Sequence, residues 1–162
     1  MKVKELMTAN PQACTSIDSL AKAATIMWEV DCGIVPVITE GGKVVGLVTD
    51  RDICMAANFA NRNLANIAVE DVISNEVFAC RPDDDVRTAL KTMQENQVYR
   101  LPVIGGDGTL EGLLSINDVV LKAEELAEKK VPELSYSDVV KTYRSLCEHR
   151  SPMEKAEAAS AS

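Results

Sequence analysis

The order of apolar and polar positions divides the first third of the chain into short, clearly bounded segments. Apolar residues recur at helical spacing over 20–28, and an unbroken apolar run at 34–38 predicts a strand. A polar turn with two glycines separates this run from a second apolar run at 44–48, a pattern typical of a hairpin. A further helix is expected to begin at Thr49.

The same order of segments returns 66 residues later. Residues 3–57 align with residues 69–123 without a gap. The most specific shared segment has a glycine, two apolar residues, a hydroxyl residue and, three positions on, an aspartate; it occurs as Gly46–Asp52 and Gly112–Asp118. Because a repeat of this kind governs the whole fold, we expect two β-α-β-β-α units with pseudo-two-fold symmetry and like sites near the axis.

The second copy is expected to follow the first closely. Its pattern predicts a helix around Leu90, strands at 98–104 and 110–114, and a last helix that continues after Asp118 to about Lys130. The fold class that follows is α/β (α+β), with an additional helix at the C-terminal end.

Other segments receive simpler predictions. Residues 12–15 indicate a short strand, and Ser16 or Asp18 is the expected N-cap of the first helix. Residues 58–68 are polar and lack a strong period, so they are expected to cross between the two copies.

The repeat also sets the expected domain boundaries, which are 1–62, 63–130 and a C-terminal region at 131–162. In that last region 135–150 is predicted to be a helix, and 153–162 is expected to be frayed. The apolar face of the predicted helix comprises Val139, Val140, Tyr143, Leu146 and Cys147.

Composition narrows the classes of partner and site. A net charge of -8 over 162 residues argues against a nucleic-acid surface or an anionic membrane. The five cysteines, at positions 14, 32, 54, 80 and 147, are scattered, which favours reduced, mostly buried thiols in a cytoplasmic protein over disulfides or a zinc site. Cys14 and Cys80 share a repeat position, and packing is the favoured role for them over redox sensing.

Two hydroxyl–aspartate pairs, Thr49 with Asp52 and Ser115 with Asp118, allow two interpretations. A Ser or Thr followed three residues later by an acid is typical of a capping box at a helix start. An ionised aspartate there can also accept hydrogen bonds from both hydroxyls of a ribose, and a helix N-terminus favours phosphate. Recurrence of the pair within the whole repeated unit favours the ligand interpretation.

These motifs lead to a family resemblance. Pro36-Val37-Ile38 precedes Gly46–Asp52, and Arg100–Ile104 precedes Gly112–Asp118 at the same spacing. Over about residues 1–125 the chain resembles a tandem pair of CBS (cystathionine-β-synthase type) domains, as in a stand-alone CBS-domain protein. The resemblance implies an adenosine-type ligand in clefts between the repeats, with AMP or ATP favoured and ADP, NAD or S-adenosylmethionine as alternatives.

The resemblance also implies which residues bind. The signature hydroxyls and carboxylates are implied to hold ribose, with Thr49 and Asp52 in one cleft and Ser115 and Asp118 in the other. Residues around the middle strands are implied to line the base and phosphate positions. These are Ile34, Pro36, Arg100 and Pro102, with Thr15, Arg81 and Arg51 as further candidates.

The two clefts are predicted to be unequal. Arg100 interrupts an otherwise apolar strand, and an arginine binds phosphate oxygens well. The first repeat has Ile34 at the equivalent position, and its own cation, Arg51, lies between two aspartates. We therefore expect the cleft of Ser115 and Asp118 to use Arg100 and to bind about tenfold to a hundredfold more tightly.

Together these features predict a regulatory, ligand-sensing module that acts in signal transduction and is not an enzyme. No nucleophile–base pair or metal cluster is visible, so neither a catalytic cofactor nor a metal is expected. The expected partners are an adenine nucleotide, a second copy in a homodimer and a protein target of unknown identity. The alternative is a protein-interaction module with vestigial clefts that acts through its C-terminal helix.

Overall fold

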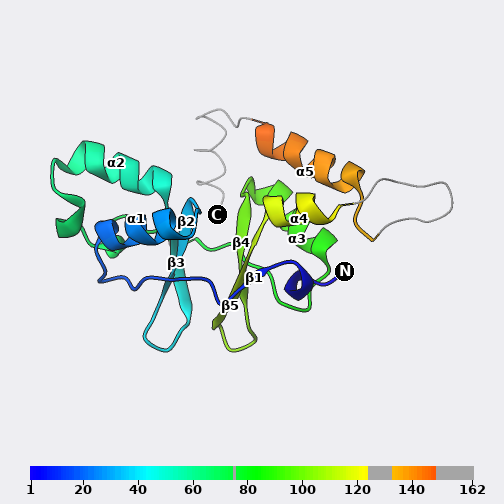
Figure 1. The fold of residues 1–162 in the computed structure, drawn as a ribbon, viewed down its shortest axis with the longest axis horizontal. Coiled ribbons are helices and arrows are strands. Elements are labelled where there is room, and N and C mark those ends of the chain that lie inside the picture. The colour runs from blue at the N-terminus through cyan, green and yellow to red at the C-terminus, as the bar shows by residue number, and fades with distance from the viewer. Residues whose placement is uncertain (75, 124–132, 149–162) are drawn as a thin grey trace, which may run out of the picture.

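Two antiparallel hairpins stand side by side at the centre of the computed structural model, which describes residues 1–74, 76–123 and 133–148 (Figure 1). Strand β2 (Ile34–Ile38) pairs with β3 (Val44–Thr49), and β4 (Arg100–Ile104) pairs with β5 (Leu110–Ser115). Both hairpins shift register just before the end of their first strand. The internal repeat is therefore conserved down to this irregularity.

Helices cover each hairpin on one side. α1 (Leu20–Glu29) and α2 (Asp50–Ala60) lie beside β2 and β3, whereas α3 (Val86–Asn96), α4 (Ile116–Lys122) and α5 (Tyr136–Cys147) lie beside the other hairpin (Figure 1). Their apolar residues at spacings of three and four face two separate cores. The fold is thus the predicted α/β (α+β) arrangement of two repeats.

The first turn of each repeat packs on the other repeat. The 3₁₀ turn η1 (Val3–Glu5) places Val3 in the core of the second half, and η3 (Val69–Asp71) places Val69 in the core of the first half. Backbone hydrogen bonds fix both exchanges: the Leu20 amide donates to the Ile67 carbonyl over 2.9 Å, and the equivalent Val86 amide donates to the Met1 carbonyl over 3.1 Å. Neither repeat completes its core alone.

The hairpin tips add a further connection. The Val44 amide donates to the Gly108 carbonyl over 3.2 Å, and the Leu110 amide donates to the Gly42 carbonyl over 3.0 Å. Gly42 and Gly108 adopt φ values of +77° and +90°, a conformation that glycine tolerates best. The paired tips hold the two sheets in one relative orientation.

Three predictions about secondary structure are wrong. The N-cap of α1 is Ser19, whose Oγ accepts from the Lys22 amide, because Asp18 instead accepts from the Thr15 amide and from Lys22 Nζ. Residues 12–15 form only the isolated bridge of Cys14 with Val37 and no strand.

The third wrong prediction concerns the end of α4. The helix stops at Lys122 because Ala123 has an extended conformation with ψ 144°, so it does not continue to Lys130 as predicted. The short strand β1 (Thr8–Ala9), which pairs with β5, and the 3₁₀ turn η2 (Leu64–Asn66) were not predicted.

α5 confirms the predicted C-terminal helix but turns a different face inward. Val139, Thr142 and Leu146 are buried against the second core, whereas Val140 is 65% exposed and Cys147 is also exposed. A step of one residue turns a helix by about 100°, so Val140 points away from the face that its neighbour Val139 shares. The predicted frayed tail, 153–162, lies outside the described residues.

The paired cysteines are packing residues. Cys14 and Cys80 are buried at equivalent positions, and burial raises the pKa of the Cys14 thiol to about 11 and that of Cys80 to about 12. A thiol that stays protonated is a poor nucleophile. The prediction of mostly buried thiols does not extend to Cys54 and Cys147, which are exposed.

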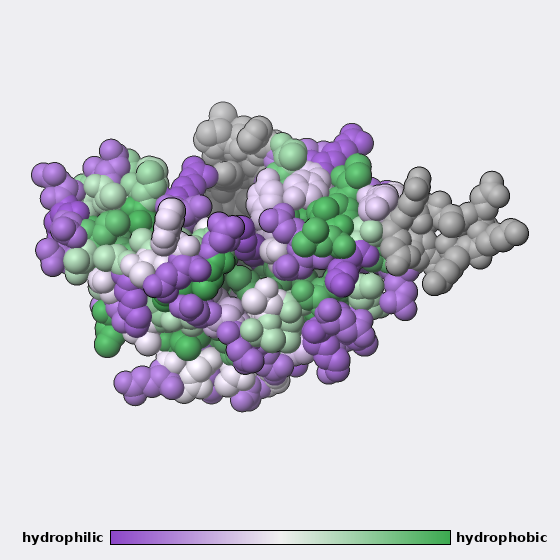
Figure 2. Space-filling model, in the orientation of Figure 1, coloured by the Kyte–Doolittle hydropathy of each residue, from purple (hydrophilic) through white to green (hydrophobic). Residues whose placement is uncertain are grey.

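Some apolar side chains remain on the surface of both halves. Trp28 on α1 is 86% exposed and Phe59 on α2 is 74% exposed, while Leu121 projects from α4. Figure 2 shows apolar residues over both helical regions, interspersed with polar ones. Each half therefore keeps apolar helical surface that its own core does not use.

The repeated glycines Gly46 and Gly112 are required by a close approach of the exchanged segments. A Cβ at Gly46 would lie 3.0 Å from the Ser74 carbonyl oxygen. A Cβ at Gly112 would overlap Met7 Sδ and lie 3.1 Å from the Thr8 carbonyl oxygen. The signature glycine thus leaves room for the segment that crosses between the repeats.

We expect Gly112→Ala to lower the free energy of unfolding by roughly 1–3 kcal/mol, because Met7 and the backbone of Thr8 must move away. The control is Gly106→Ala, since nothing lies within 4 Å of a Cβ at Gly106; its effect should stay within about 0.5 kcal/mol. Urea denaturation measures both. Equal stability of the two variants would show that the close approach does not constrain residue 112.

Candidate functional site

The two repeated hydroxyl–aspartate pairs cap α2 and α4 in the same way. The Thr49 amide and hydroxyl both donate to Asp52 Oδ2, over 2.8 and 2.7 Å, and the Asp52 amide donates back to Thr49 Oγ1 over 3.2 Å. The corresponding distances for Ser115 and Asp118 are 2.8, 2.6 and 3.2 Å. Both pairs are complete capping boxes, so the prediction that these residues cap helices is confirmed.

A third box outside the repeats shows what capping alone requires. Ser135 and Asp138 make the same three hydrogen bonds at the start of α5, over 3.0, 2.8 and 3.3 Å. Asp138 also lies 3.6 Å from the guanidinium of Arg87. By contrast, Asp52 and Asp118 form no ion pair with any residue within the described ranges, and they keep capacity to accept further hydrogen bonds.

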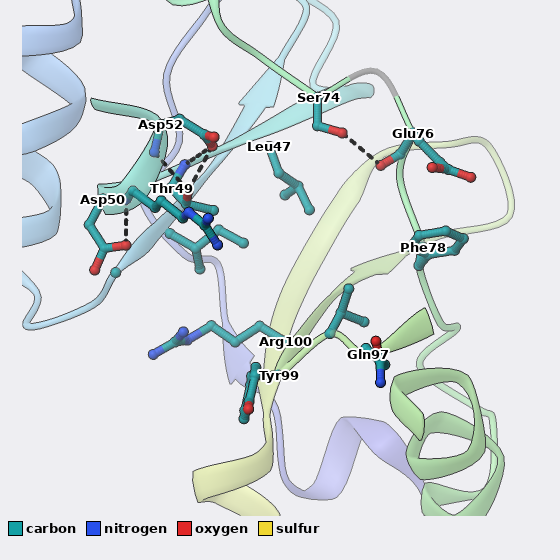
Figure 3. Close-up of a pocket in the computed structure, with 14 residues that line it drawn as sticks. Leu47, Thr49, Asp50, Asp52, Ser74, Glu76, Phe78, Gln97, Tyr99 and Arg100 are labelled. Atoms are coloured by element: carbon teal, nitrogen blue, oxygen red, sulfur yellow. Dashed lines mark hydrogen bonds between the residues drawn. The ribbon is translucent and has the colours of Figure 1, made fainter. Parts of the chain in front are cut away.

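A pocket of about 560 Å³ lies between the two repeats, next to Thr49 and Asp52. Its volume is in the range typical of sites for small ligands. One wall comes from β2, β3 and the start of α2, and the other from β4 and the segments before it (Figure 3). The lining residues are Gly33, Ile34, Leu47, Thr49, Asp50, Arg51, Asp52, Ser74, Glu76, Phe78, Gln97, Val98, Tyr99 and Arg100.

Arg100 lines this pocket, which the sequence did not predict. The sequence predicts Arg100 in the cleft of Ser115 and Asp118, its neighbours within the repeat. The structure places Arg100 in the pocket of Thr49 and Asp52, because β4 runs along the boundary between the repeats and its first residue points across it (Figure 3). The backbone of Arg100 remains paired with Ser115 of β5. Its guanidinium makes no hydrogen bond or ion pair with the part of the chain that the structure describes.

The start of α2 offers little to an anion through its backbone. The Asp50 amide donates to the Gly33 carbonyl over 3.2 Å, and the Arg51 amide donates to Asp50 Oδ1 over 2.7 Å. The Asp52 amide is already bonded to Thr49. Phosphate recognition by this helix end is therefore not supported at α2, and a guanidinium is the better-placed anion ligand.

Comparison with known proteins agrees with the repeat. The family model described as "CBS domain" matches residues 3–58 and again residues 69–125. The chain belongs to the CBS-domain family. The Bacillus subtilis (strain 168) protein YlbB is 31% identical to it over 140 residues, which are 85% of this chain and 93% of that relative.

Solved structures of CBS pairs share the fold. The CBS-domain pair of protein MJ0100, in complex with 5′-methylthioadenosine and S-adenosyl-L-methionine, has a TM-score of 0.68 at 22% identity and covers 75% of this chain and 94% of that one. CBSX2 from Arabidopsis thaliana, in complex with AMP, has a TM-score of 0.64 at 24% identity and covers 74% and 93%. At these identities the likeness establishes the CBS-pair fold.

The remaining predicted residues of this CBS pair lie in different surroundings. Pro36 and Pro102 are buried in the middle of β2 and β4, where their carbonyls accept from the amides of Cys14 and Cys80. Thr15 is half-buried, and its amide is bonded to Asp18. Arg81 is exposed and lines a different pocket, of about 480 Å³, together with Lys4, Asp83 and Glu111. The structure therefore brings together Ile34, Thr49, Arg51, Asp52 and Arg100.

Several pocket residues were not predicted. Gln97 and Tyr99 precede β4, and Ser74, Glu76 and Phe78 come from the first part of the second CBS domain, between η3 and α3. A signal for Tyr99 was present, since it directly precedes the arginine that interrupts the apolar strand. No local pattern marks Phe78, which reaches the pocket because of the path that the chain takes between η3 and α3.

None of the helices in the described ranges is long and apolar enough to span a membrane.

The cap of α5 generates a pH-dependent prediction. Desolvation opposes ionisation of Asp138, but hydrogen bonds from the Ser135 amide and hydroxyl and the nearby Arg87 guanidinium lower its pKa below the ordinary value. A lowered folded-state pKa contributes stability above the unfolded-state pKa of about 3.9, and this stability is lost as the pH falls through the folded-state value. Asp138→Asn should thus cost about 1 kcal/mol at pH 7, because the neutral amide makes weaker hydrogen bonds than the carboxylate.

Urea denaturation should show that this difference from the unmodified chain shrinks as the pH falls below about 4. Asp71→Asn is the control, because the Asp71 side chain is exposed and makes no hydrogen bond with a described residue; its effect should be small at every pH. A difference for Asp138→Asn that stayed constant down to pH 2 would contradict the role of the ionised carboxylate.

Proposed function

We propose that this CBS pair is a regulatory module that binds an adenosine-type ligand in the pocket of Thr49, Asp52 and Arg100. One observation carries the proposal: a guanidinium without a described partner lies across a nucleotide-sized cavity from a carboxylate that can accept more hydrogen bonds. The solved pairs that bind AMP or S-adenosyl-L-methionine support the same ligand class.

Each part of the ligand has a chemical counterpart. The ribose hydroxyls donate to Asp52, whose Oδ2 is already oriented by Thr49. The base lies against the apolar side chains of Ile34 and Leu47, and a phosphate or carboxylate faces Arg100. By pseudo-symmetry, Ser115 and Asp118 are proposed to hold a second ribose near Pro102.

The charges of the pocket favour few phosphates. Its lining has three carboxylates, from Asp50, Asp52 and Glu76, but two guanidiniums, from Arg51 and Arg100. Each additional phosphate charge meets this excess of negative side chains. S-adenosylmethionine, whose methionine end has no net negative charge, and AMP, whose single phosphate carries a charge of about -1.5 to -2, are therefore proposed over ATP, which has two further phosphates.

Binding without turnover is the proposed activity. The Thr49 hydroxyl donates to Asp52, but the same hydrogen bond recurs in the purely structural cap at Ser135, so it does not mark an activated nucleophile. The ligand is thus proposed as a signal, with no catalytic cofactor involved.

The proposal predicts a saturable rise in melting temperature with AMP or S-adenosylmethionine, because a ligand that binds only the native state stabilises it. A panel of AMP, ADP, ATP, NAD and S-adenosylmethionine at millimolar concentration, with protein shown to be nucleotide-free, tests this. If none of the five shifts the transition, the protein-interaction module with vestigial clefts becomes the better description.

Calorimetry on variants tests the residue roles. Arg100→Ala should weaken AMP roughly tenfold to a hundredfold while changing adenosine little, since the guanidinium is proposed to contact the phosphate. Asp52→Asn should weaken both ligands, and Ser19→Ala, which removes the N-cap of α1 outside the pocket, is its control. Equal weakening by the Asp52 and Ser19 variants would reduce Asp52 to a structural role.

We also propose that the protein forms a homodimer through the apolar surface of α1 and α2. A two-fold dimer is the commonest closed assembly, and Trp28 and Phe59 lie exposed on these helices. Light scattering at micromolar concentration should give about twice the chain mass of 17.5 kDa. Phe59→Asp should yield a monomer, whereas Val140→Asp on α5 should not. A monomeric unmodified chain would refute the proposal.

A further inference from the structure

Two residues of the ligand pocket are bonded to the last turn of α5. The Tyr99 hydroxyl donates to the Leu146 carbonyl over 3.1 Å. Gln97 Nε2 donates to the Ser145 carbonyl over 3.3 Å and to the Glu148 carbonyl over 2.6 Å. Figure 3 shows Gln97 and Tyr99 on the same wall of the pocket as Arg100. The segment just before β4 therefore faces the ligand site and α5 together.

These bonds satisfy a general need of a helix end. The last four carbonyls of a helix have no partner within it and must be bonded from outside. At the end of α5, Gln97 and Tyr99 provide three such bonds. Ser145 Oγ also donates to the Gln94 carbonyl over 3.2 Å, so the attachment of this turn depends in part, through three of four hydrogen bonds, on where the pocket wall holds these two side chains.

The rest of α5 is anchored without the pocket. Gln94 Nε2 donates to Thr142 Oγ1 over 2.7 Å, and Arg87 lies 3.6 Å from Asp138. Neither Gln94 nor Arg87 lines the pocket. The helix therefore has one set of contacts that holds it on α3 and a second set that reaches the ligand site.

The hydrogen bonds between the pocket wall and α5 have no counterpart in the first repeat. At the offset of 66 residues, Gln97 and Tyr99 correspond to Asp31 and Gly33. There the same region is an open pocket of about 540 Å³, which Arg100 also lines. The CBS match ends at residue 125, so α5 is an addition to the CBS pair that fills this place in one repeat.

We propose that α5 is the output element of the ligand site: occupation of the pocket strengthens the attachment of its C-terminal turn through Tyr99 and Gln97. This inference rests on the proposed ligand site. A ligand that contacts Tyr99 and Arg100 restricts the segment before β4 to the conformation that also bonds α5, so it binds the attached state better. By linkage, loosening α5 lowers ligand affinity by the same factor.

Hydrogen exchange on the full chain tests the coupling, with AMP and S-adenosylmethionine as probes in separate series. Saturating probe should slow amide exchange in residues 136–147 by about fivefold or more, the usual lower bound for coupled sites. Tyr99→Phe keeps the ring but removes the donor to Leu146. At probe concentrations that saturate this variant by calorimetry, the slowing should be largely lost.

Gln94→Ala is the matched control, because it loosens α5 on α3 without altering the pocket wall. In the Gln94 variant, amide exchange in residues 136–147 should be faster than in the unmodified chain without probe and should still slow when the probe binds. The affinity of the variant for the probe should fall. Probe binding with unchanged exchange in 136–147, or equal slowing in the Tyr99 variant, overturns the coupling and leaves the ligand site standing. If neither probe binds by calorimetry, the ligand site and the coupling both fail.

Discussion

The exchange of first turns between the two CBS domains is the constraint on which the rest of the structure depends. Val69 and Val3 each complete the other repeat's core, and their amides donate to the carbonyls of Asp18 and Asp84 over 2.8 and 3.0 Å. The segments that follow press against Gly46 and Gly112, where a side chain would not fit. Two units that bury each other's apolar residues in this way must fold as one, and their boundary becomes a defined surface.

The ligand pocket is a consequence of that boundary. β4 lies along it, so Arg100 lines a pocket together with Thr49 and Asp52 of the other repeat. The three capping boxes show that the hydroxyl–aspartate pair is ordinary helix chemistry, since it also occurs at Ser135, which does not line the pocket of Asp52. What differs at Asp52 is its setting: a cavity on one side and a cation without a described partner opposite. The proposed function of this structural motif therefore depends on the residues that surround it.

α5 breaks the pseudo-symmetry of the pair. The two repeats match closely in hairpins, register shift and caps, yet among the described residues only the second repeat carries a helix over the end of its first long helix. Side chains at equivalent positions of the two repeats explain why α5 packs on the second repeat. Gln97 and Tyr99 donate to carbonyls of α5, whereas Gly33, the equivalent of Tyr99, has no side chain that could do so. A symmetric scaffold thereby gains one pocket wall that is bonded to an additional helix.

The sequence by itself determined the repeat, the hairpins, the capped helices and the family, because these follow from local periodicity and from spacing along the chain. It also identified Thr49, Asp52 and Arg100 as candidates. It did not determine which of them share a cleft, since Arg100 and Asp52 are 48 positions apart and meet only through the packing of the two repeats. Tertiary structure likewise decided that Ser19 caps α1, that α4 ends at Lys122 and that Val140 faces outward. These features depend on packing against distant parts of the chain or on competition among neighbouring candidate caps. Packing and cap competition do not appear in the periodicity of the sequence.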